Sequence, residues 1–175
     1  RGGDGVWTAR IPEVAAGAWY FEQLWVNGRR AMRARTPNEF YFHVRGAVDR
    51  GFDPATGQDG DLTRRAFKAR AEDVAPLRSV PREALNDVTV VAYHSWETSR
   101  SRVAGLSPSG NVVVLTAPIL WGFAYWGPNC RYHIANFRAA LDAPGEWFLA
   151  RDGTLSYVPR PGEDMTAAEV VAPAF

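Results

Sequence analysis

FEQLWVNGRRAMRARTPN, residues 21–38, decides the fold that we expect for this chain. An Asn-Gly pair lies in it between two runs that alternate apolar and polar residues. Both central residues of a type I′ turn need positive φ, which Asn and Gly adopt at little cost. Such a two-residue loop fixes the register of the strands, so that Val26 faces Arg29. The stretch therefore predicts a tight β-hairpin.

The same register assigns the neighbouring side chains to the two faces of the hairpin. Glu22 faces Arg33, and Arg35 lies on the same charged face. The opposite face is expected to be buried, because it carries mainly large apolar side chains, namely Trp19, Phe21, Trp25, Met32 and Ala34. Locally, a solvated charged face is the ordinary interpretation of Glu22, Arg33 and Arg35.

Length and composition are those of one globular domain. The chain has 175 residues, 46% of them hydrophobic and 22% charged, which is enough for a substantial core. The net charge of +1 favours neither nucleic acid nor an anionic membrane as a partner. The single cysteine, Cys130, cannot form an internal disulfide. We therefore expect a single β-rich domain over residues 1–175, monomeric and without a membrane segment.

Short strand patterns follow one another along most of the chain. The strands are expected near residues 5–11, 40–45, 66–70, 87–96, 99–106, 111–116, 146–150 and 154–158. The segment 46–61 is rich in Gly and Asp and is expected to be an exposed loop. Only 134–141 has apolar residues at helical spacing (Ile134, Phe137, Leu141). The sequence thus predicts an all-β fold, an antiparallel β-sandwich or irregular β-barrel, with one short helix near 134–141.

Candidate catalytic and metal-binding residues are few. A glycosidase needs two carboxylates about 5 to 10 Å apart, and Glu97 beside Trp96 and Glu146 beside Trp147 are the two candidates. The alternative is structural, with Glu97 at the tip of a hairpin and Glu146 at the start of a strand. The three histidines and Cys130 lack metal-ligand spacing, and no phosphate-binding or dinucleotide motif is present. We predict no catalytic residue, no metal and no cofactor.

Tryptophan is the unusual component, with seven in 175 residues. Six of them could stack on the C–H faces of sugar rings, although core packing competes for the same rings: Trp19, Trp25, Trp96, Trp121, Trp126 and Trp147. Glycine or proline next to Trp121 and Trp126 favours loop positions for these two, with Tyr125 between them. We therefore predict a carbohydrate-binding surface at Trp121, Tyr125 and Trp126, and burial of Trp19 and Trp147.

Three motifs in this order carry a resemblance: LWVNGRRAMRARTPN at 24–38, HSWETSR at 94–100, and LDAPGEWFL with DGTLSYVP at 141–149 and 152–159. Together they resemble the insertion domain of family-141-like glycoside hydrolases, which are right-handed parallel β-helix proteins acting on plant cell-wall glycans. The resemblance implies a secreted or periplasmic protein and places the catalytic carboxylates in the β-helix, outside these motifs. It also implies a return to the β-helix within 168–175.

The resulting hypothesis is a non-catalytic accessory domain that packs on a parent β-helix, with a plant-type glycan as a further partner. Arg33, Arg35 and Asn38 are the candidates for the docking face, and Arg33 or Arg35 is expected to be partly exposed with few internal hydrogen bonds. Two alternatives remain open. One is an autonomous carbohydrate-binding module, and the other is an independent glycosidase that uses Glu97 and Glu146.

Overall fold

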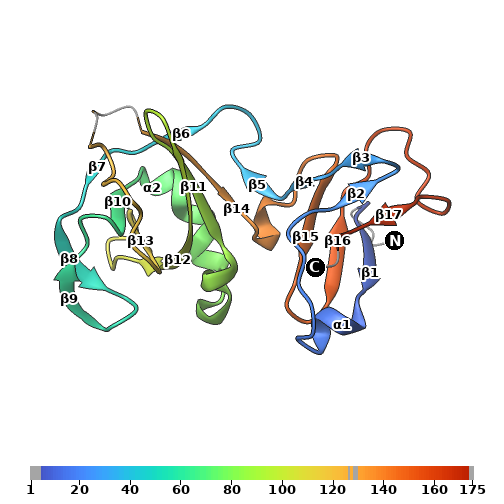
Figure 1. The fold of residues 1–175 in the computed structure, drawn as a ribbon, viewed down its shortest axis with the longest axis horizontal. Coiled ribbons are helices and arrows are strands. Elements are labelled where there is room, and N and C mark those ends of the chain that lie inside the picture. Colours follow the sequence, from blue (N-terminus) through green and yellow to red (C-terminus); the bar gives the residue numbers. More distant parts are fainter. Residues whose placement is uncertain (1–4, 126, 128–129, 174–175) are drawn as a thin grey trace. The chain divides into compact units, whose positions relative to one another are not determined.

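The computed structural model describes residues 5–125, 127 and 130–173, and its chain divides into two compact units. The first unit combines Arg1–Arg35 with Asn136–Phe175, and the second is Thr36–Ala135 (Figure 1). Strands dominate both units. Since no described sheet closes on itself, the all-β prediction is confirmed in its sandwich-like form rather than as a barrel. That the two units act as one domain stays a prediction.

The first unit contains two small sheets. One has the order β1-β16-β15-β4, in which only β15 and β4 run parallel, and the other has the order β17-β2-β3. Its elements are β1 (Trp7–Arg10), α1 (Pro12–Ala15), β2 (Trp25–Val26), β3 (Arg29–Arg30), β4 (Met32–Arg33), β15 (Glu146–Leu149), β16 (Thr154–Tyr157) and β17 (Val170–Val171). The two-residue strand β5 (Arg35–Thr36) spans the boundary to the second unit.

The second unit is built on one large antiparallel sheet. Its strand order is β14-β11-β12-β13-β10-β7, with β6 also paired to β14, and β8 and β9 form a separate hairpin. Its strands and α-helix are β6 (Phe42–His43), β7 (Gly46–Ala47), β8 (Arg50–Asp53), β9 (Gln58–Asp61), β10 (Ala66–Lys68), α2 (Ala71–Val74), β11 (Thr89–Tyr93), β12 (Thr98–Leu106), β13 (Val112–Leu115) and β14 (Arg131–Ala135). Two 3-10 helices, Ala75–Ser79 and Arg82–Asp87, lie between α2 and β11. In the described ranges no helix is long and apolar enough to cross a bilayer.

The Asn-Gly hairpin has the predicted turn and register. Asn27 and Gly28 both have positive φ, 51° and 72°, and Val26 pairs with Arg29. The prediction of its buried face is wrong near the turn. Leu24, Val26 and Ala31 are buried, whereas Trp25 is half-buried and Met32 is 54% exposed. The core of the first unit packs against the face that carries Leu24, Val26 and Ala31. The size of the apolar side chains therefore does not decide which face of the hairpin is buried.

The helix predicted over 134–141 does not form along that range. Ile134 and Ala135 are the last two residues of strand β14, and the helical part is a three-residue 3-10 turn, Arg138–Ala140. Asn136, with φ of 66°, separates the two. Four consecutive residues of β14, Tyr132–Ala135, are buried because the strand lies between β11 and β6. Continuous burial of a central strand hides the alternation that would have identified it.

The Gly- and Asp-rich segment 46–61 is not a plain loop either, because β7, β8 and β9 lie within it. Asp53 is buried at the end of β8, where its carboxylate accepts hydrogen bonds from Ala55 N (2.9 Å) and Arg65 Nη1 (2.6 Å). The Arg65 guanidinium also donates to Leu115 O of β13. A buried ion pair therefore ties this hairpin to the sheet of the second unit.

Candidate functional site

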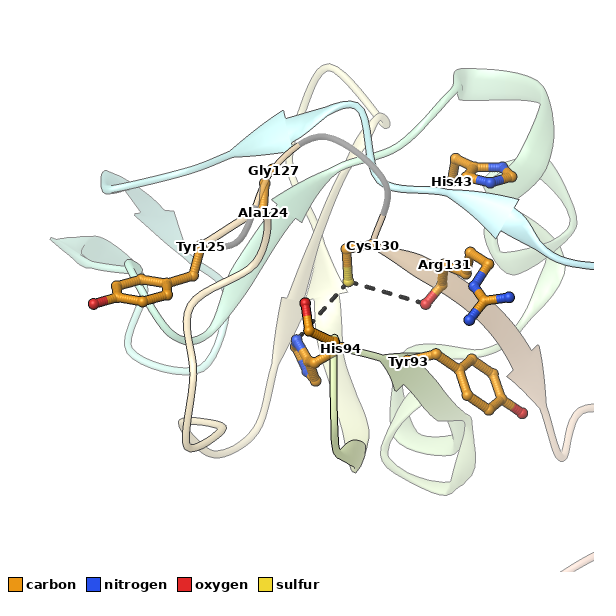
Figure 2. A pocket seen from close by; sticks show the side chains of 9 residues that line it. His43, Tyr93, His94, Ala124, Tyr125, Gly127, Cys130 and Arg131 are labelled. Carbon is orange, nitrogen blue, oxygen red and sulfur yellow. Dashed lines mark hydrogen bonds between the residues drawn. The ribbon is translucent and has the colours of Figure 1, made fainter.

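The hairpin between β11 and β12, strand β6, the start of β14 and described residues that precede it line a pocket of about 380 Å³ in the second unit. That volume lies within the range typical of small-molecule sites. The lining residues are His43, Tyr93, His94, Ser95, Ala124, Tyr125, Gly127, Cys130 and Arg131. In Figure 2, Cys130 and His94 lie between Tyr125 on one side and Arg131 on the other. No carboxylate is among the described residues that line the pocket.

A group of aromatic side chains lies on the surface next to this pocket. Trp96 at the hairpin tip and Tyr125 are 61% and 62% exposed, and Trp121 is half-buried. Trp121 contacts both neighbours, with ring centroids 5.8 Å from Trp96 and 5.7 Å from Tyr125. We call these three residues the aromatic cluster. Exposed rings held by one another offer an apolar face with little entropy left to lose on binding.

The tryptophan predictions have mixed outcomes. Trp147 is buried, as predicted, and Trp19 is partly buried against the same core. Trp121 and Tyr125 lie on the surface as expected, but Trp126 lies outside the described residues. Trp96 was not singled out from the sequence, although its exposure is among the highest of the large apolar side chains that the structure describes. Its position at a hairpin tip is the signal that would have indicated it.

At the base of the pocket, His94 joins a short chain of hydrogen-bonding groups. Its Nε2 lies 2.9 Å from Ser99 Oγ, the Ser99 hydroxyl donates to Glu97 Oε1 at 3.3 Å, and Cys130 Sγ lies 4.0 Å from Nδ1. This order is consistent with a proton on Nε2 and an acceptor at Nδ1 facing the thiol. Glu97 thus orients the Ser99 hydroxyl and does not line the pocket.

A cysteine beside a histidine can be a nucleophile only where the thiolate is accessible. Burial raises the pKa of Cys130, although a backbone hydrogen bond with Ala124 and the charge of Arg131 act to lower it, and the side chain is almost fully enclosed. Burial likewise lowers the pKa of His94, while Glu97 acts to raise it. Both groups are therefore neutral at pH 7. The pair is a structural contact rather than a nucleophile with an activating base.

We expect NMR titration to give His94 a pKa below the ordinary value of about 6.5. Since the unfolded chain binds a proton more readily than the folded one, the stability contribution of His94 is complete above pH 6.5 and is lost as pH falls through its folded pKa. His94→Asn should therefore reduce the loss of stability between pH 7 and 5, measured by urea denaturation at each pH. A pKa of 6.5 or above for His94 would contradict the prediction.

Glu146, the second candidate carboxylate, belongs to the first unit and has a structural role. It is 3% exposed, and its two oxygens accept hydrogen bonds from Arg35 N (3.1 Å), Asp142 N (3.2 Å) and Ala143 N (3.1 Å). Burial raises the pKa of Glu146, and the three backbone donors act to lower it. The carboxylate has no free face for a substrate.

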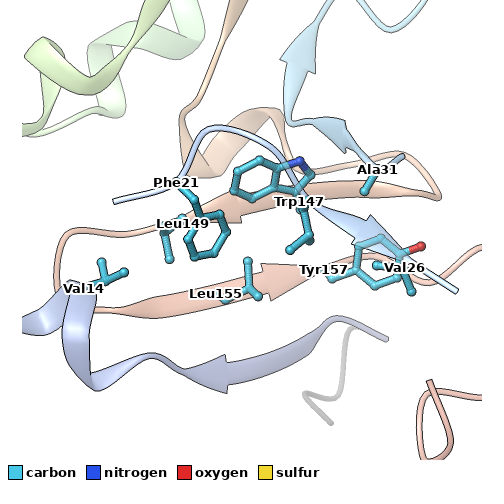
Figure 3. Close-up of a cluster of buried hydrophobic side chains, with 9 residues drawn as sticks. Val14, Phe21, Val26, Ala31, Trp147, Leu149, Leu155 and Tyr157 are labelled. Carbon is cyan, nitrogen blue, oxygen red and sulfur yellow. The ribbon is translucent and has the colours of Figure 1, made fainter. Parts of the chain in front are cut away.

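Arg33, a candidate for the docking face, is buried inside the first unit. Its side chain is 9% exposed, its Nε donates to Asn136 Oδ1 at 2.9 Å, and its guanidinium lies 5.0 Å from the ring centroid of Trp147. Trp147 belongs to the cluster of buried side chains drawn in Figure 3. The expectation that Arg33 or Arg35 is partly exposed with few internal hydrogen bonds is therefore wrong for Arg33, because β4 lies beside β15 and brings the guanidinium over that ring. Arg35 is half-buried and Asn38 is exposed, so these two remain the candidates.

Over residues 5–125, 127 and 130–173, no three His, Cys, Asp or Glu side chains gather closely enough to hold an ion.

No protein-family model matches the sequence, and no curated protein matches it significantly. A search of solved structures finds a chain titled "Glycoside hydrolase" with a TM-score of 0.75 and 23% sequence identity. The match covers 99% of the present chain and 30% of that chain. The present chain thus spans about a third of the protein that it resembles. Both units therefore have the fold of one part of a glycoside hydrolase.

Proposed function

We propose that this chain is a non-catalytic accessory domain, inserted in a secreted β-helix glycoside hydrolase that acts on plant cell-wall-type polysaccharides. The observation that carries the proposal is the extent of the structural match, which includes nearly all of this chain but only 30% of the longer hydrolase. The three sequence motifs agree with that assignment. In this role the domain packs on its parent and shapes the surface that the polysaccharide meets.

Two features of the first unit support the insertion. Its outer strands β1 and β17 come from opposite ends of the described chain, and Ile11, next to β1, lines the same groove as Val170–Ala172. An inserted domain must leave and rejoin its host at neighbouring points, so this arrangement fits. Arg35 and Asn38, near the passage from one unit to the other, are the residues that we propose for contact with the β-helix.

The non-catalytic part of the proposal rests on the two candidate carboxylates. Glu146 is enclosed and saturated by backbone donors, and Glu97 orients Ser99. Paired carboxylates that act on a glycosidic bond must both face the substrate. Neither residue is placed for that task.

A second candidate function is that of an autonomous carbohydrate-binding module. The aromatic cluster favours it, because contiguous exposed aromatic rings beside a pocket typically mark a binding surface. The two candidates differ in whether the isolated chain binds glycan without its parent.

Incubation of the purified chain with arabinoxylan and pectin tests the proposal. We expect no release of reducing ends above the background of a heat-denatured sample. Turnover that disappears in Glu97→Gln or Glu146→Gln would overturn the non-catalytic assignment. Retardation in an affinity gel that contains the same polysaccharides, lost in Trp121→Ala, would favour the autonomous module.

A further inference from the structure

Arg131 is the arginine among the described residues that line the pocket. It begins β14, its side chain is exposed, and its guanidinium lies 5.2 Å from the ring centroid of Tyr41. Tyr41 in turn packs against Tyr93 at 4.8 Å, so the arginine is held over an aromatic pair. Among the described residues, no carboxylate forms an ion pair with Arg131. A guanidinium positioned in this way has donors to offer to a ligand.

The acidic groups nearby are engaged elsewhere. Glu97 accepts from Ser99, and Asp73 interacts electrostatically with Arg70, Arg45 and His43. Since Arg131 is permanently charged and no described lining residue is acidic, the lining of the pocket carries a positive charge. Such a pocket attracts an anion, and the planar fork of arginine fits a carboxylate with two parallel hydrogen bonds.

The same pocket is bordered by the aromatic cluster, because Tyr125 belongs to both. A ligand that satisfies both parts therefore has a ring with an apolar face and, next to it, a carboxylate. We propose that this site binds a uronic-acid unit of an acidic glycan, with Arg131 holding the carboxylate and the aromatic cluster stacking on a neighbouring sugar ring. The inference rests on the proposed carbohydrate-related function and narrows its ligand to acidic polysaccharides.

Calorimetric titration with an oligogalacturonate and with its methyl-esterified form tests the assignment, because the ester keeps the sugar rings and removes the charge. We expect the free acid to bind about tenfold or more tightly than the ester, and the difference to shrink with added salt. Arg131→Gln should remove this preference, whereas Arg64→Gln, at an exposed arginine of the same unit outside the pocket, should preserve it. Trp96→Ala should weaken both ligands.

Each outcome decides between distinct claims. Equal affinity for acid and ester, or a preference that survives Arg131→Gln, overturns the uronic-acid assignment and leaves the accessory-domain proposal standing. Absence of binding to both oligosaccharides also overturns the assignment. Hydrolysis of either one would instead contradict the non-catalytic function. Thermal melting of each variant checks that it is folded. We expect unchanged melting temperatures, because the side chains changed in the pocket are exposed.

Discussion

Glu146→Ala is expected to lower the free energy of unfolding by about 3 kcal/mol. The substitution removes the acceptor of three backbone N–H groups, which come from Arg35, Asp142 and Ala143. These donors join β5 and the turn before β15 through one carboxylate. An unsatisfied buried donor costs about 1–3 kcal/mol, and water can reach Asp142, which is exposed. The expected loss of stability is therefore smaller than the cost of three fully unsatisfied donors.

Urea denaturation followed by tryptophan fluorescence measures this loss. Glu169→Ala is the matched control, because Glu169 is an exposed glutamate of the same unit, and its substitution should change stability by less than about 0.5 kcal/mol. If Glu146→Ala also lost less than 1 kcal/mol, roughly the effect of one exposed hydrogen bond, the three contacts would not be stabilising.

Arg33→Ala is expected to cost about 2 kcal/mol, although a solvated surface pair would contribute less than about 1 kcal/mol. The guanidinium donates to Asn136 Oδ1 and, at 3.3 Å, to the Tyr20 hydroxyl, and it lies over Trp147 in the core cluster of the first unit. Its ion pair with Glu22 is long, 3.8 Å, and Glu22 is 48% exposed. The expected loss therefore comes from the hydrogen bonds and the ring contact.

Arg33→Lys separates these contributions from charge alone. Lysine keeps the positive charge but cannot reproduce the fork that reaches Asn136 and Tyr20, so it should retain less than half of the stabilisation. Arg29→Ala, at an exposed arginine of the same hairpin, is the control and should be neutral within about 0.5 kcal/mol. Full stability of the lysine variant would show that charge is sufficient.

Local patterns were enough for much of the strand content. The pairing of β11 with β12, β13 as the next strand, and the hairpin of β15 and β16 follow from β-branched runs and turn residues that specify strands within a few positions. Gly153, with φ of 86°, provides the turn between β15 and β16. These features depend on neighbours in sequence, which is why a single sequence predicts them.

The candidate site was predicted only in part. Trp121 was expected at the surface because glycine lies beside it, which is a local signal, and Tyr125 because it lies between Trp121 and Trp126. Arg131, His94 and Cys130 carried no such signal, because they meet only where β14 pairs with β11 and the β11–β12 hairpin reaches the segment before β14. Residues about 36 positions apart become neighbours through sheet order, which local periodicity does not encode.

The sequence by itself determined that the chain forms an all-β fold, where the Asn-Gly turn lies and how its strands are paired. Only the tertiary structure decided which face of that hairpin is buried and what its arginines do. Alternation defines two faces, but the choice between them depends on the sheet that packs against the hairpin. In this chain β4 pairs with β15 from 114 positions away, because Met32 faces Glu146 and Arg33 faces Trp147. That pairing brings Arg33 over Trp147 and turns a residue with the appearance of a solvated charge into part of the core.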